Sequence, residues 1–234
     1  MSKADLHLYT ASTMNGWKPL IFLEEAGLDY ELTAIDFGRK EQKAPAYLAL
    51  NPNGRIPTLV DRGNDGFTVF ESGAILWYLA EKYGCFLPPD DEGRSLALQW
   101  LMFQMSGVGP MMGQAMYFQR IAEPQGHRDE FAIQRYVEES RRLLEVVNNR
   151  LAGRSYLLGD DYSIVDMAMY PYARAYPWAK VSVDGLDHLK AWFHRLDRRP
   201  AIQRALTLPK PFPAFFGEGD EGGSEAANAA RFKD

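Results

Sequence analysis

The chain has 234 residues, 46% hydrophobic and 24% charged, which is enough apolar material for one large or two small globular domains. Its net charge of −5 at pH 7 excludes a globally basic, nucleic-acid-binding character. Its single cysteine, Cys85, excludes an intramolecular disulfide, a Cys-x-x-Cys pair and a cysteine-rich zinc site. The histidines lack ligand spacing, so we expect no metal. Without an apolar run of about 18 residues or a signal-peptide core, we expect no membrane association and a cytoplasmic location.

The first part of the chain alternates strand and helix patterns. Alternating apolar and polar residues predict strands, and apolar residues at helical spacing predict helices. We therefore expect strands at 6–10, 30–37, 56–61 and 67–72, and helices at 17–27, 44–52 and 72–84. Ser72 is the expected N-cap of the last helix and Gly84 its stop. The order β-α-β-α-β-β-α predicts a small four-stranded mixed sheet with flanking helices in a domain of residues 1–86.

The rest of the chain has helical patterns throughout. A linker at 87–93, rich in Pro and Asp, precedes expected helices at 94–121, 128–153, 163–178 and 187–206. Gly107, Gly109 and Pro110 are expected to interrupt the first of these, and Pro200 to divide the last. Ser163 and Asp166 form a capping box, to which we assign a structural role. The expected fold class is therefore α/β plus all-α, with a helical domain at 94–212 and a flexible tail at 213–234.

Ile56-Pro57 is the first motif that can carry chemistry. Proline in a strand belongs at its start or at a sheet edge, because it lacks a backbone donor. At such a turn, the backbone N–H and C=O of Ile56 can pair with an extended ligand. An ordinary edge proline is the alternative, and on this motif alone it is the better explanation.

Two further motifs lie at predicted helix starts. The Ser72 hydroxyl and nearby backbone N–H groups can bind a carboxylate, and Glu71 can accept from an ammonium group, so the pair suits the charged end of an amino acid. Thr13 and Asn15 can surround a thiolate with hydrogen-bond donors at the positive end of the first helix, which lowers a thiol pKa. Plain helix capping explains each motif equally well when it is taken alone.

Together these motifs, followed by an all-helical domain, resemble the cytosolic glutathione transferases, whose first domain resembles thioredoxin. The resemblance extends from residue 6 to about 206 and includes "NPNGRIPTLVD", "FESGAILWYLAEKYG" and "YSIVDMAMYPY". "TMNG", "SGVGPMMGQAMYF" and "QRYVEESRRLLEVVNNRL" resemble the nu-class bacterial enzymes and the glutathione-transferase-like domain of a fungal nitrogen regulator. This resemblance implies a homodimer that binds two glutathiones or one glutathione disulfide. It also implies glutathione-dependent reduction of disulfide bonds.

The resemblance also implies roles for individual residues. Thr13 and Asn15 match the residues beside the sulfur, with Ser12 as a competitor and Tyr9 a weaker one. Ile56 should pair with the cysteinyl unit of glutathione, and Pro57 should follow a cis bond. The γ-glutamyl end of glutathione should be held by Glu71 and Ser72.

The remaining expected contacts lie at the other end of the ligand. Gln42 matches a residue near the glycyl carboxylate, and Lys43 can take that anion instead. Arg135 matches an arginine that reaches toward a second glutathione. Arg55 is either a further contact or a surface charge.

We give Cys85 a structural role.

Two other functions remain open at this point. The same site can conjugate glutathione to electrophiles or reduce peroxides. Alternatively, the chain can be a glutathione-binding regulator with little catalysis, although the Asn/Gln-rich extension of the fungal regulator is absent.

Overall fold

The computed structural model describes residues 4–211, which form two compact units. Of the described residues, the first unit comprises 4–87 with 198–211, and the second comprises 88–197. The segment predicted to be a flexible tail, 213–234, lies outside the described residues. Each unit is described separately below.

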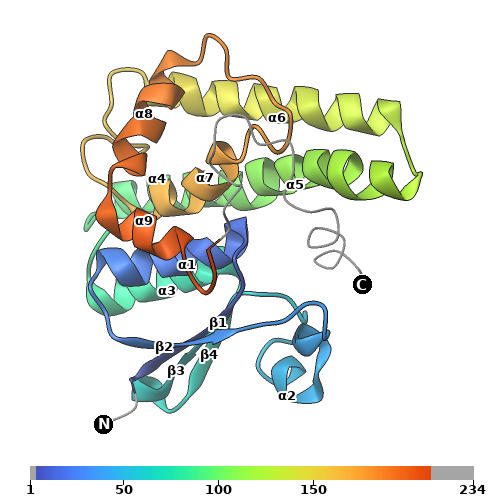
Figure 1. The fold of residues 1–234 in the computed structure, drawn as a ribbon. Helices are drawn as coiled ribbons and strands as arrows, with labels where there is room; N and C mark the ends of the chain where they lie inside the picture. The colour runs from blue at the N-terminus through green and yellow to red at the C-terminus, as the bar shows by residue number, and fades with distance from the viewer. Residues whose placement is uncertain (1–3, 212–234) are drawn as a thin grey trace. The chain divides into compact units, whose positions relative to one another are not determined.

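The first unit is built on a four-stranded mixed sheet in the order β2-β1-β3-β4 (Figure 1). β1 pairs in parallel with β2, whereas β3 is antiparallel to both β1 and β4. The strand bounds are Leu6–Thr10 for β1, Tyr30–Ala34 for β2, Thr58–Asp61 for β3 and Phe67–Phe70 for β4. This topology confirms the four-stranded mixed sheet expected from the sequence.

Helices α1 (Met14–Glu25) and α3 (Ser72–Tyr83) pack against each other on one side of this sheet (Figure 1). Their inward faces are apolar and fully buried, as are the sheet residues beneath them, which makes this the core of the unit: Leu8, Leu20, Leu23, Leu59, Ile75, Leu76 and Leu79. The short helix α2 (Pro45–Leu48) lies in the long connection between β2 and β3. Gly84 ends α3 with φ of +64°, as expected for its C-cap.

Two helix starts differ from expectation. α1 begins at Met14 rather than at residue 17, because the Thr13 hydroxyl caps the helix by accepting from the Gly16 N–H at 3.1 Å. Ser72 is the first residue of α3 and not its N-cap. The N-cap is Glu71, whose φ of +71° is unusual for a residue with a side chain.

The end of the described chain belongs to the first unit, although the sequence suggested a helical domain that continues to residue 212. α9 (Pro200–Leu206) packs against α1. Arg199 forms a bidentate pair with Glu25, with Nε and Nη2 at 2.6 and 2.8 Å from its carboxylate oxygens. Arg204 pairs with Glu24 at 2.8 Å. These charge pairs between α1 and the α9 segment could not be read from local sequence patterns.

The second unit is all helical within its described part. It contains α4 (Asp91–Phe103), α5 (Gly109–Tyr117), α6 (Glu130–Leu151), α7 (Ile164–Arg174) and α8 (Asp187–Asp197). The expected interruption near Gly107, Gly109 and Pro110 is confirmed, because α4 ends at Phe103, a π-helical segment spans Gln104–Val108 and α5 begins at Gly109. Pro110 falls in the first turn of α5, where it is tolerated.

α7 is the central helix of this unit, since all its residues from Ile164 to Ala173 are buried. The capping box expected at Ser163 and Asp166 is present at its start. The division of the last helical segment at Pro200 is also confirmed, because α8 ends at Asp197 and α9 begins at Pro200.

Within residues 4–211, no helix is long and apolar enough to cross a membrane. The same residues contain no cluster of three or more His, Cys, Asp or Glu side chains that could hold a metal ion.

Candidate functional site

The sheet topology brings three of the predicted site motifs to one end of the sheet. This end, where β1 and β4 end and β3 begins, is called the edge below. Tyr9 pairs with Thr58, and Thr58 pairs with Phe70. β1 and β4 therefore end, and β3 begins, at the same edge, because β3 is antiparallel to both. The residues just beyond these pairs are the turn leading to Thr13, the Ile56-Pro57 segment and the Glu71-Ser72 corner.

The N-termini of α1 and α3 both start at this edge, immediately after β1 and β4. Neither helix has an acidic residue in its first turn, although the N-cap of α3 is the acidic residue Glu71. Two helix N-termini with their unpaired N–H groups create a region that favours anions.

Thr13 is well placed to donate a hydrogen bond at this edge. Its side-chain oxygen accepts from the Gly16 N–H, so the hydroxyl hydrogen can still be donated. Gly16 must be glycine, because a Cβ there would lie 2.0 Å from the Ala11 carbonyl oxygen. Asn15 lies in the first turn of α1 and is partly exposed.

Ser12, the competitor for the sulfur contact, has other partners. Its hydroxyl donates to the Lys210 carbonyl at 2.6 Å and accepts from the Lys210 N–H at 3.3 Å. The side chain is 7% exposed. Ser12 therefore anchors the segment after α9, which favours Thr13 over Ser12 as the donor at the edge.

The Ile56–Pro57 bond is cis, as the resemblance implied. The turn before it is fixed by two side chains that sequence reasoning missed. The Tyr47 hydroxyl and the Asn51 amide donate to the Arg55 carbonyl at 2.8 and 2.7 Å. Burial raises the pKa of Tyr47 to about 12, so this phenol stays a donor at neutral pH. The signal in the sequence was Asn51 within "NPNG", a typical turn pattern.

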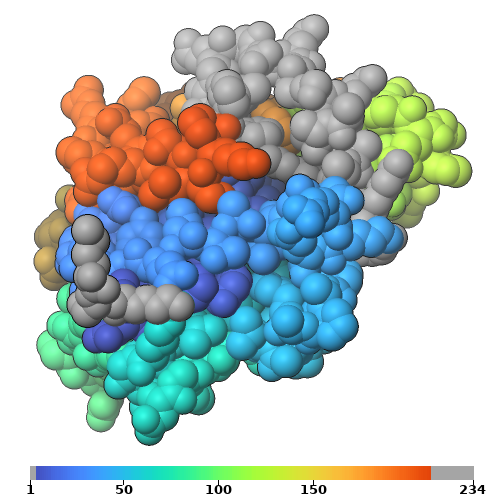
Figure 2. Space-filling model, turned by 60° about the horizontal axis from the view of Figure 1, so that its bottom comes forward, coloured from blue at the N-terminus to red at the C-terminus, as the bar shows by residue number. Residues whose placement is uncertain are grey.

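Gln42 and Lys43 lie against the same turn. A Cβ on Gly54 would come within 3.0 Å of the Gln42 carbonyl oxygen and 3.2 Å of Lys43 Cδ. Gln42 is 8% exposed, and its Oε1 has no hydrogen-bond partner within the described residues. Lys43 and Arg55 are exposed. Figure 2 shows the connection between β2 and β3 as light-blue atoms on one side of the first unit.

The Glu71-Ser72 corner combines an exposed carboxylate with a buried hydroxyl. Ser72 is 2% exposed, and its Oγ accepts from the Nζ of Lys18 at 3.3 Å. Lys18 lies in α1 and is only 1% exposed. Burial lowers the pKa of Lys18 to about 7, although the nearby charge of Glu71 opposes this shift.

Lys18 is a buried residue beside this corner that sequence reasoning missed. A lysine on an amphipathic helix is ordinarily expected at the surface. A signal was nevertheless present, because Ile21 and Phe22, three and four residues later, are apolar and share its helix face.

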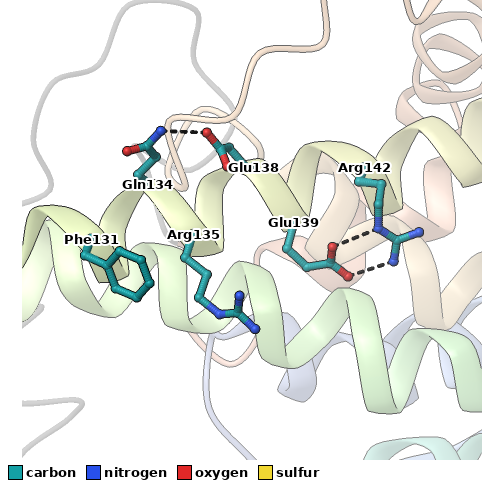
Figure 3. A pocket seen from close by; sticks show the side chains of 6 residues that line it. All are labelled: Phe131, Gln134, Arg135, Glu138, Glu139 and Arg142. Carbon is teal, nitrogen blue, oxygen red and sulfur yellow. Dashed lines mark hydrogen bonds and ion pairs between the residues drawn. The ribbon is translucent and has the colours of Figure 1, made fainter.

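Arg135 belongs to the second unit, on the exposed side of α6. It lines a pocket of about 460 Å³ together with Phe131, Gln134, Glu138, Glu139 and Arg142. Arg142 is held by Glu139 through two hydrogen bonds of 2.8 and 2.7 Å. Figure 3 shows Arg135 extending from the helix with no such bond to these carboxylates.

Cys85, the chain's only thiol, lies at the other end of α3 from Ser72. A 12-residue helix is about 18 Å long, which separates this thiol from the edge. Burial raises the pKa of Cys85, so its thiolate is disfavoured. A thiolate at the edge must therefore come from a ligand.

Comparison with known proteins agrees with this geometry. Residues 4–81 match the family model of the glutathione S-transferase N-terminal domain, and residues 108–200 match that of the C-terminal domain. The chain belongs to the glutathione S-transferase family. Among relatives in this family, it is 42% identical over 205 residues to the disulfide-bond oxidoreductase YfcG of Escherichia coli, covering 86% of this chain and 94% of that protein.

Two solved glutathione transferases are similar in fold. The enzyme from Burkholderia graminis, which holds two glutathione molecules per subunit, matches with a TM-score of 0.82 and 42% identity over 88% of this chain and 89% of its own. The enzyme from Pseudomonas putida, with one glutathione disulfide per subunit, matches with a TM-score of 0.81 and 38% identity over 88% and 92%.

Proposed function

We propose that this glutathione S-transferase family member binds glutathione at the sheet edge and catalyses glutathione-dependent reduction of disulfide bonds. The observation that carries the proposal is the convergence of Thr13, Ile56 and Glu71-Ser72 at one edge, beside two helix N-termini. Further support comes from relatives described as a disulfide-bond oxidoreductase and as glutathione- and glutathione-disulfide-bound enzymes.

The chemistry needs no sulfur from the protein. A glutathione thiolate attacks one sulfur of a disulfide RSSR, forms a glutathione mixed disulfide and expels RS⁻, which takes up a proton. A second glutathione thiolate then attacks the glutathione sulfur of the mixed disulfide, so that glutathione disulfide forms and the other RS⁻ leaves. Thiolate fraction and alignment set the rate of both steps.

Each residue at the edge has a role in this proposal. Thr13 and Asn15 donate hydrogen bonds to the thiolate at the start of α1, where the helix end also stabilises negative charge. The backbone of Ile56, next to Pro57, pairs with the cysteinyl unit. Ser72 binds the γ-glutamyl carboxylate, and the exposed Glu71 carboxylate accepts from its ammonium group.

The other predicted contacts serve the glycyl end and a second ligand. Gln42 and Lys43 suit the glycyl carboxylate, because both can donate to it, Gln42 from its side-chain amide nitrogen and Lys43 from its exposed ammonium group. Arg55 is an exposed cation that can add to this attraction. Arg135 suits a carboxylate of a second glutathione or of the other half of glutathione disulfide.

The direct test compares Thr13→Ala and Asn15→Ala with wild type in glutathione-dependent reduction of hydroxyethyl disulfide. Loss of one hydrogen bond to a charged acceptor should slow the reaction about 10- to 100-fold. Thr13→Ser, which keeps both the helix cap and the donor, is the matched control. Cys85→Ser should retain wild-type activity, because its thiol lies at the far end of α3.

Other outcomes identify the alternatives. Full activity in both Thr13→Ala and Asn15→Ala would contradict their assignment as donors to the thiolate. Loss of disulfide reduction in Ser12→Ala alone would assign that contact to Ser12 instead. Turnover of an aromatic chloride or a hydroperoxide, but not of the disulfide, would indicate conjugation or peroxide reduction. Retained glutathione binding with no turnover would indicate a binding protein.

A homodimer is part of the same proposal. The chain exposes large apolar side chains on α4 and β4, which favour burial against another surface: Phe67 at 51%, Phe70 at 39%, Leu98 at 43% and Met102 at 49%. Light scattering at micromolar concentration should give twice the 26.5 kDa chain mass, and a value of one chain mass would contradict it.

A further inference from the structure

The segment that follows α9, residues 207–211, is fastened to the start of α1 and is called the strap below. The Ser12 hydroxyl donates to the Lys210 carbonyl at 2.6 Å and accepts from the Lys210 N–H at 3.3 Å. The indole N–H of Trp17, in α1, donates to the Leu208 carbonyl at 3.2 Å. Ser12 is 7% exposed and Trp17 is 1% exposed, so water competes weakly for these bonds. The backbone of the strap therefore has a fixed place beside the turn that leads into α1.

We propose that the strap holds the Lys210 ammonium group beside the thiolate position at Thr13, and that this charge makes the protein prefer disulfides with carboxylates close to their sulfur atoms. This inference rests on the proposed reduction of disulfides by glutathione. Lys210 is the specificity-determining residue, and Ser12 is a positioning residue that acts through the strap.

The bonds of the strap limit how far Lys210 can lie from Thr13. The N–H and the C=O of Lys210 both meet the Ser12 hydroxyl, so the Lys210 Cα lies within about 5 Å of that oxygen. Thr13 directly follows Ser12, and the Cα atoms of neighbouring residues are about 3.8 Å apart. The lysine ammonium group sits on a flexible four-carbon stem. It can therefore approach a ligand bound at the start of α1.

Lys210 brings a positive charge to this end of α1. Its side chain is exposed, and no carboxylate among residues 4–211 forms an ion pair with it. Arg199 and Arg204, which precede it, are instead paired with Glu25 and Glu24 at the opposite end of α1. The charge of Lys210 therefore adds to the positive end of the helix, whereas the charges of these two arginines are largely neutralised.

A cation at this position acts on the second reactant. The glutathione thiolate must approach a disulfide sulfur, and like charges repel when that disulfide carries carboxylates. An ammonium group about 10 Å from a carboxylate offsets the repulsion by an amount that corresponds to about two- to tenfold in rate at low ionic strength. Salt weakens this attraction, because the Debye length is about 8 Å at physiological ionic strength. A disulfide without charge gains nothing from the same cation.

The test compares two small disulfides as substrates of the full-length protein with glutathione. Dithiodiglycolate carries two carboxylates, and hydroxyethyl disulfide carries none. The measured quantity is the ratio of kcat/KM for the anionic disulfide to kcat/KM for the neutral one. The intrinsic reactivities of the two disulfides cancel when this ratio is compared between variants.

Lys210→Met removes the charge and keeps a long side chain at an exposed position. The ratio should fall about two- to tenfold relative to wild type at low ionic strength, and the difference should shrink at physiological ionic strength. Lys210→Glu reverses the charge and should lower the ratio further. Lys190→Met, which removes one charge from α8, is the matched control and should keep the wild-type ratio.

Ser12→Ala tests the strap separately from the charge. This variant keeps Lys210 but removes both bonds to its backbone, so the ratio should fall in the same direction as in Lys210→Met, by a smaller factor. Ser12→Thr keeps the hydroxyl and should restore the ratio. An equal loss with both disulfides in Ser12→Ala would overturn the positioning role.

The outcomes separate this inference from the proposed function. If wild type reduces hydroxyethyl disulfide but Lys210→Met keeps the wild-type ratio, the role of Lys210 is wrong and the proposed function stands. The same holds if Lys190→Met lowers the ratio as much as Lys210→Met does. If wild type reduces neither disulfide with glutathione, the proposed function and this inference both fail.

Discussion

Two buried ionisable side chains, one in each unit, are held in different ways. Asp166 in the second unit accepts four hydrogen bonds, from the backbone N–H groups of Leu157 and Ser163, the Ser163 hydroxyl and the Trp192 indole. Lys18 in the first unit donates to the Ser72 hydroxyl at a predicted ligand subsite. Both are fully buried, and burial shifts the pKa of each toward neutrality, to about 6 for Asp166 and about 7 for Lys18.

The two side chains differ in where they lie: Asp166 lies between elements of the second unit, and Lys18 lies beside the candidate site of the first. The four donors around Asp166 come from α8 and from the segment before α7, so its carboxylate, on α7, joins parts of the second unit to one another. The Lys18 contact ends on a hydroxyl that starts α3 at the sheet edge. A buried charge that accepts several hydrogen bonds joins parts of a fold to one another, whereas a buried charge with a shifted pKa beside a candidate site is a candidate for a functional role.

The largest expected effect is on Asp166. Asp166→Ala leaves buried donors without an acceptor, which should destabilise the protein by about 4 kcal/mol and lower Tm by about 8–16 °C. Asp160→Ala, at an exposed position, should change Tm by less than about 2 °C. The folded Asp166→Ala fraction should bind S-methylglutathione as wild type does. A normal Tm for Asp166→Ala would contradict the folding role.

The Asp166 effect should also depend on pH. Its folded-state pKa of about 6 lies above the unfolded value, so its contribution to stability is greatest below about pH 4 and is lost as pH rises through 6. The destabilisation caused by Asp166→Ala should therefore be about 1 kcal/mol larger at pH 5 than at pH 7. Urea unfolding of both proteins at the two pH values measures this difference.

Lys18→Met should give a smaller stability change of opposite sign. Replacing a buried cation by an apolar side chain removes a desolvation cost, so Tm should equal or exceed the wild-type value by up to about 5 °C. Because the pKa of Lys18 is lowered on folding, this gain should be larger at pH 6 than at pH 8. A large fall in Tm would make Lys18 a folding residue like Asp166 and end the contrast.

Most of the fold was predictable because it follows from local patterns. The alternation in 6–10, the glycine after α3 and the capping box at Ser163 each specify structure within a few residues. Contacts between distant segments of the chain could not be predicted in this way. The α9 segment joins the first unit through charge pairs with residues more than 170 positions away in the chain. No local pattern contains that information.

The candidate site was predictable only in part for the same reason. The turn and helix-start motifs that contain Thr13, Pro57 and Ser72 are visible in sequence, and the strand register explains why they meet. The residues that form hydrogen bonds with these motifs lie far away in the sequence, so no local pattern identifies them. Lys18 donates a hydrogen bond to Ser72, which is 54 positions away in the sequence. Ser12 donates to the Lys210 carbonyl, which is 198 positions away.

The central claim is that the reactive thiolate belongs to bound glutathione and is stabilised at the start of α1. The most direct measurement is an ultraviolet titration of the glutathione thiolate bound to Cys85→Ser, with and without the additional Thr13→Ala change. The account predicts a bound-thiol pKa well below that of free glutathione, and a return toward the free value when Thr13 is replaced. An unshifted pKa in the Thr13-containing protein would contradict the account.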